Sequence, residues 1–87
     1  MKYQLVLQWP FSSETDFDRL LLLEEMIEND LGDLGIVDGH DCGSGEMNIF
    51  IHTNEPEVVF GKVKALLDLR KESETLKAGY RDFEADE

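Results

Sequence analysis

The chain has 87 residues, of which 20 are acidic and 8 are basic, and its formal net charge is −12. This length predicts one small domain over residues 1–87, and so acidic a surface disfavours nucleic acid and anionic membranes as partners. One cysteine excludes an internal disulfide, and no apolar run is long enough to cross a membrane.

Residues 2–9 alternate between apolar and polar side chains, which predicts a strand with one buried face. The buried set comprises Tyr3, Leu5, Leu7 and Trp9. Gln4, Val6 and Gln8 lie on the other face. Because Gln4 and Gln8 interrupt the apolar run, these residues do not resemble a signal peptide, and we expect a cytoplasmic protein.

A helix is predicted from Ser13 to about Leu31. Ser13 followed by Asp16 resembles a capping box with Asp in place of the usual Glu. An apolar stripe follows at helical spacing, made of Phe17, Leu20, Leu21, Ile27 and Leu31. Gly32 and Gly35 then mark where the helix ends.

Residues 36–52 predict a β-hairpin with a three-residue loop, Gly43-Ser44-Gly45. Such a loop places Cys42 opposite Glu46, His40 opposite Asn48, and Asp38 opposite Phe50. The even-numbered residues then share the exposed face, and the odd-numbered Val37, Met47, Ile49 and Ile51 face the core. A two-residue loop would pair His40 with Ile49 and turn polar groups toward the core, so we prefer the longer loop.

A second helix is predicted from Asn54, its expected cap, to about Lys71, with Pro56 in the first turn. Residues 76–83 alternate weakly, with Leu76, Ala78 and Tyr80 on one face, and predict a short fourth strand. Residues 84–87 are acidic and are expected to fray.

The predicted order β-α-β-β-α-β is that of the ferredoxin-like α+β fold. Two right-handed crossovers place both helices on one face of a four-stranded antiparallel sheet, with the first and third strands central and adjacent. The other face of the sheet is then left open.

The stretch VDGHDCGSGEMNIFIH holds both histidines and the only cysteine of the chain. Asp38, His40 and Cys42 alternate along the first hairpin strand and are candidate metal ligands. No established spacing motif supports a metal, so we expect neither a metal nor a cofactor. Neighbouring carboxylates disfavour a thiolate at Cys42, and Ser44 is not in a nucleophile elbow, so no catalytic residue is predicted.

The open sheet face and the hairpin are instead the predicted binding surface, formed by Asp38, His40, Asp41, Glu46, Asn48, Phe50 and His52. The favoured function is a non-enzymatic binding module for a protein or small-molecule partner. A protein partner would be basic if charge contributes to recognition. One alternative is a dimeric α+β-barrel enzyme with a pocket between two facing sheets. A third possibility is an acidic inhibitor or immunity-type protein.

The run DGHDCGSGEMNIFIHTNEP, between the strand YQLVLQW and a helix with the pattern V-F-x-x-V-K-x-L-L, resembles a family of small, acidic, uncharacterised bacterial proteins. The resemblance extends from Tyr3 to about Tyr80. It implies the hairpin and the ferredoxin-like fold, and it implies no activity.

Overall fold

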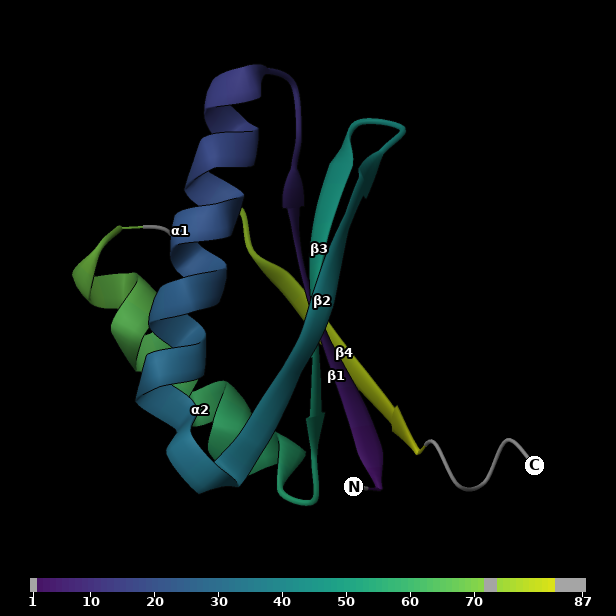
Figure 1. Ribbon diagram of the computed structural model, residues 1–87, viewed down its shortest axis with the longest axis vertical. Helices are drawn as coiled ribbons and strands as arrows, with labels where there is room; N and C mark the ends of the chain where they lie inside the picture. The colour runs from purple at the N-terminus through teal and green to yellow at the C-terminus, as the bar shows by residue number, and fades with distance from the viewer. Residues whose placement is uncertain (1, 72–73, 83–87) are drawn as a thin grey trace.

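The computed structural model describes residues 2–71 and 74–82, and the predicted frayed tail lies outside these ranges. The elements follow the order β-α-β-β-α-β, so the predicted ferredoxin-like fold is confirmed (Figure 1). They are β1 (Tyr3–Pro10), α1 (Glu14–Leu31), a 3-10 turn (Gly32–Leu34), β2 (Gly35–Gly43), β3 (Glu46–Thr53), α2 (Pro56–Leu69) and β4 (Lys77–Asp82). Within the described ranges, no helix combines the length and apolarity needed to cross a bilayer.

The sheet has the strand order β2-β3-β1-β4, and every neighbouring pair is antiparallel. β1 and β3 are therefore central, as predicted, and β2 and β4 form the edges. Both helices lie on one side of the sheet, and none of the described elements covers the opposite side (Figure 1). The molecule is thin in one direction, 35 × 28 × 19 Å, as two packed layers require.

The core lies between the sheet and the helices. Alternate side chains of β1 and β3 point toward the helices, and those helices contribute residues at helical spacing. The buried apolar residues are Leu5, Leu7, Trp9, Leu20, Leu23, Ile27, Leu31, Met47, Ile49, Ile51, Val59, Val63 and Leu67. Two residues of the predicted α1 stripe, Phe17 and Leu21, remain exposed because they lie beside the stripe that packs on the sheet.

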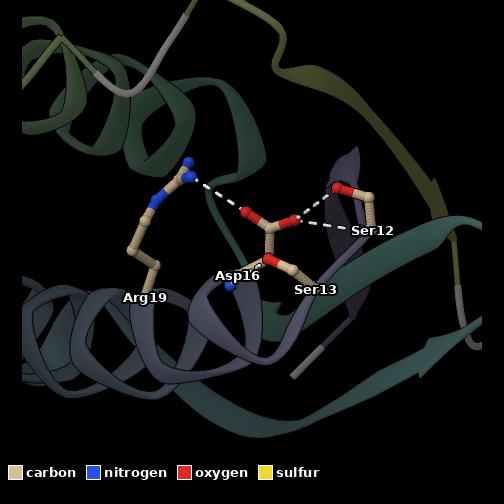
Figure 2. A network of polar contacts seen from close by, with 4 residues as sticks. All are labelled: Ser12, Ser13, Asp16 and Arg19. Atoms are coloured by element: carbon tan, nitrogen blue, oxygen red, sulfur yellow. Dashed lines mark hydrogen bonds and ion pairs between the residues drawn. The ribbon is translucent and has the colours of Figure 1, made fainter.

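The N-terminus of α1 is held by the predicted cap, Ser13, whose Oγ accepts a hydrogen bond from the backbone N–H of Asp16 at 3.4 Å. The Asp16 carboxylate accepts from the backbone N–H and the hydroxyl of Ser12, at 2.9 and 3.1 Å. Arg19 donates to its other oxygen at 3.0 Å (Figure 2). In a capping box this carboxylate would reach the cap residue itself, whereas here it reaches one residue further back.

These contacts lower the pKa of Asp16, chiefly through the backbone hydrogen bond from Ser12 and also through the hydroxyl of Ser12 and the charge of Arg19. A lowered pKa in the folded state stabilises the fold above the ordinary carboxyl pKa, and this contribution is lost as pH falls through the lowered value.

Asp16→Asn should therefore reduce the melting temperature at neutral pH, and the difference from wild type should disappear in acid. Thermal unfolding across pH tests this, with the exposed Asp18→Asn as the matched control. A difference that persists below pH 2 would contradict it.

The start of α2 differs from the prediction, because Asn54 does not cap it. The N-cap residue is Glu55, whose side chain makes no capping bond. Thr53, fully buried, accepts from the backbone N–H of Glu55 at 2.9 Å and donates to the carbonyl of Leu34 at 2.7 Å. Asn54 accepts from the backbone N–H of Lys2 instead, at 2.9 Å.

The hairpin between β2 and β3 has a two-residue loop, so the predicted three-residue loop is wrong. Gly43 pairs with Glu46, and both loop residues have positive φ, 52° at Ser44 and 81° at Gly45. Positive φ at both positions is the type I′ geometry, which matches the twist of the flanking strands. This loop pairs His40 with Ile49, the arrangement that the sequence disfavours because it turns polar groups toward the core.

A β-bulge at Asp38 makes the short loop compatible with an apolar core. Val37 pairs with Ile51 and Gly39 pairs with Phe50, so Asp38 is an extra residue in β2. The extra residue shifts the alternation of β2 by one position. Before the bulge the odd-numbered Val37 faces the core, and after it the even-numbered His40 and Cys42 are on the core side. Gly39 has a φ of 149°, a conformation that residues with side chains rarely adopt.

Gly45→Ala should destabilise the protein by about 1 kcal/mol, because the new Cβ opposes the positive φ of the turn. Gly61→Ala is the matched control, since Gly61 is exposed within α2 and nothing lies within 4 Å of an added Cβ. That change should stabilise the helix by about 0.5–1 kcal/mol. Urea unfolding measures both, and a neutral effect of Gly45→Ala would contradict the turn geometry.

Candidate functional site

The uncovered side of the sheet is the candidate site, and we call it the sheet face. The register places its side chains in three rows across the four strands. The tip row, nearest the hairpin loop, is Asp41, Asn48, Gln8 and Lys77; the middle row is Gly39, Phe50, Val6 and Gly79; the base row is Ile36, His52, Gln4 and Arg81. Asp38 lies at the bulge between the middle and base rows, and Glu46 lies beyond the tip row.

The middle row is apolar. Phe50 and Val6 are neighbours on the two central strands, and both are only partly buried. Ile36 adds an apolar side chain in the base row and is 58% exposed. The middle row ends in a glycine on each side, Gly39 on β2 and Gly79 on β4. A groove of about 310 Å³ passes over Gly79 beside Val6. A central apolar strip with small residues at its ends can accept another surface at close range.

The polar side chains of the sheet face bind one another. Gln8 donates through Nε2 to Glu46 at 3.0 Å and to Asn48 at 3.1 Å. Arg81 donates to the amide oxygen of Gln4 at 3.3 Å. These bonds hold the amides in defined orientations, so less free energy is lost when a partner covers them.

The two histidines lie on opposite faces of the sheet. His52 lies on the sheet face, with its Nε2 3.4 Å from the carboxylate of Asp38. His40 points to the helix side, where its Nδ1 lies 3.0 Å from Glu24 and its ring meets that of Phe17 edge-on. The shift in the β-bulge is the reason, because it reverses the phase of the hairpin tip.

The predicted binding residues are therefore divided. Six of the seven lie together on the sheet face, namely Asp38, Asp41, Glu46, Asn48, Phe50 and His52. His40 does not join them. Asp41 is exposed and pairs with Asn48 in the tip row.

The three candidate metal ligands are separated in the same way. Cys42 pairs with Met47 and packs against the core cluster, and His40 contacts Glu24, whereas Asp38 lies on the sheet face. Among residues 2–71 and 74–82, no group of three His, Cys, Asp or Glu side chains is arranged to hold a metal ion. The hairpin residues thus do not converge on one point.

Charge is distributed unevenly across the sheet face. Its carboxylates, Asp38, Asp41 and Glu46, belong to the hairpin. Its cations, Lys77 and Arg81, belong to β4 at the opposite edge. The face is nearly balanced in charge although the chain carries −12. Much of the acidic excess lies elsewhere, as on α1, which exposes Glu14, Asp18, Glu25, Glu28 and Asp30.

The contribution of β4 to this surface was not predicted from the sequence. The alternation of Leu76, Ala78 and Tyr80 already assigned one face of β4 to the helix side. The same alternation places Lys77 and Arg81 on the opposite face, which is the sheet face. Ile36 was also missed, although it precedes the bulge and belongs to the even-numbered face that the predicted hairpin register leaves exposed.

Comparison with protein-family models, with curated proteins and with solved structures gave no match to this chain. The resemblance to a family of small acidic bacterial proteins therefore stays a prediction.

Burial raises the pKa of the Cys42 thiol, and the neighbouring Asp41 carboxylate raises it further. Asp41→Asn should lower this pKa and increase the rate of alkylation by iodoacetamide at a given pH, because the thiolate is the reactive form. The pKa should remain above that of an ordinary cysteine, because burial is the larger cause. The pH dependence of alkylation measures it, with Glu46→Gln as the control. An unchanged profile for Asp41→Asn would contradict the assignment.

Proposed function

We propose that the protein is a non-enzymatic binding module whose sheet face takes a protein partner. The observation that supports this is the uncovered middle row, in which Phe50 and Val6 lie side by side across the two central strands. Partly exposed apolar side chains on a rigid sheet, surrounded by polar groups, are the arrangement found at the centre of protein interfaces.

The surroundings of the middle row support a specific contact. Gln8, Asn48 and Glu46 form one hydrogen-bonded group, and His52 lies against Asp38. Side chains that already hold one orientation lose little conformational entropy on binding. The two aspartates on the β2 edge and the two cations on the β4 edge would fix the orientation of a partner.

The sheet face also fits this role better than the acidic surface of α1. α1 offers dispersed charge, which attracts basic molecules without selecting among them. The sheet face combines apolar area, oriented amides and charges of both signs. Binding through it should depend only modestly on ionic strength, because the apolar contact is not screened by salt.

Site-specific photo-crosslinking in living cells tests the proposal. A benzophenone amino acid at Asn48, in the tip row on the central strand β3, should give a covalent adduct of higher mass than the chain. The same group at Lys62, exposed on α2, is the matched control and should give none. The mass and sequence of the adduct identify the partner.

Phe50→Asp should abolish the adduct, because it places a charge in the apolar middle row. Val58→Asp makes the same kind of change on α2, where Val58 is 50% exposed, and should leave the adduct intact. Circular dichroism confirms that both variants fold. Equal adducts from Asn48 and Lys62, or no adduct from Asn48, would overturn the proposal.

A further inference from the structure

We propose that the partner of the sheet face is a second copy of this chain, packed face to face about a two-fold axis parallel to the strands. This inference rests on the proposed function and specifies its partner. It follows from the way in which the two edges of the face differ in charge.

A two-fold axis parallel to the strands keeps each row at its own height and reverses its order. The tip row of one copy then lies over the tip row of the other, with β2 over β4. Asp41 comes opposite Lys77 of the second copy, and Asn48 comes opposite its Gln8. In the base row Ile36 comes opposite the second copy's Arg81, and Asp38 lies beside this contact, at the bulge between the lower rows on the same edge. Each pairing occurs twice in the dimer.

The middle row is self-complementary in the same arrangement. Phe50 comes over Val6 of the second copy, so the two apolar pairs form a continuous strip. Gly39 comes over the second copy's Gly79, so the ends of the strip carry no side chain to hold the sheets apart. Stacked sheets pack about 10 Å apart with their strands within about 30° of alignment. The long side chains of Lys77 and Arg81 can reach across such an offset.

Charge selects this orientation over the other two-fold arrangement. With the axis perpendicular to the strands, β4 would lie over β4 and β2 over β2. Lys77 would then meet Arg81 of the second copy, and Asp41 would approach its Asp38. Like charges in direct contact oppose association, so the parallel axis is favoured.

Charge also explains why this face, among the surfaces described, suits a second copy. Two chains that each carry −12 repel one another in general. The sheet face has three carboxylates and two cations, with Asp38 and Asp41 on the β2 edge and both cations on the β4 edge, so it is the place where two copies attract. Its four strands and three rows cover roughly 20 Å by 20 Å. That area is at the low end for specific interfaces, so the dimer should be weak and should depend on concentration.

A charge-swap experiment tests the arrangement. Asp41→Lys places two cations together at each contact, and Lys77→Asp places two carboxylates together. Each single variant should raise the dissociation constant of the homodimer roughly tenfold. An equimolar mixture of the two variants should restore association, because both contacts then join a lysine to an aspartate. Sedimentation velocity over a range of concentrations measures the homodimers. Native mass spectrometry with one variant labelled with ¹⁵N measures the mixed dimer.

Matched controls separate contact from overall charge. Asp18→Lys on α1 and Lys62→Asp on α2 change the net charge by the same amounts at exposed sites away from the face. These variants should not show recovery on mixing. Weakening by both face variants with recovery in their mixture supports the proposal.

Two results would overturn this inference. One is a dimer to which the face and control variants respond alike. The other is a single-chain mass at every concentration. If Asn48 then crosslinks to a different protein, the proposed function would stand. If Asn48 gives no crosslink, both this inference and the proposed function would be overturned.

Discussion

A single extra residue in β2, Asp38, decides which side chains of the hairpin face the helices and which face away. Strand residues alternate strictly, so one inserted residue exchanges the two faces for everything beyond it. Below the bulge Val37 packs on the core, and above it Cys42 does so. The two-residue type I′ turn shifts the pairing of β2 with β3 by one residue, and the bulge at Asp38 compensates for that shift. The alternate residues of β3 can therefore stay buried.

The bulge also places the polar residues of β2 on different faces of the sheet. His40 and Glu24 join the hairpin tip to α1 on the helix side, while Asp41 and Asn48 remain available on the sheet face. The face that results has an apolar centre and edges of opposite charge, in a chain whose total charge is strongly negative. A barrel enzyme, the alternative predicted from the sequence, would use this same face and would require two copies to close it.

The parts of the fold that follow from local pattern could be predicted from the sequence. The alternation in β1 and the Ser13 cap of α1 depend on near neighbours, and the structure has both. The hairpin register could not be predicted, because a shorter loop and a bulge compensate each other and leave the apolar pattern of β3 unchanged. Thr53, rather than Asn54, serves the start of α2 because it is buried beside the carbonyl of Leu34, a contact across nineteen residues of sequence. In the candidate site, Asn48, Phe50 and His52 of β3 lie on the predicted face, whereas the bulge puts His40 on the helix side.

The bulge has a further consequence for how the chain avoids uncontrolled association. β2 is an edge strand, and a regular edge can template the addition of further strands and so lead to aggregates. At Asp38 the ladder is irregular and a carboxylate stands beside the break, which makes continuous pairing along this edge unfavourable. At the other edge, Lys77 and Arg81 alternate along the short β4. Growth from edge to edge is disfavoured at both ends of the sheet, so the proposed contact through its face would give a closed pair instead of a fibre.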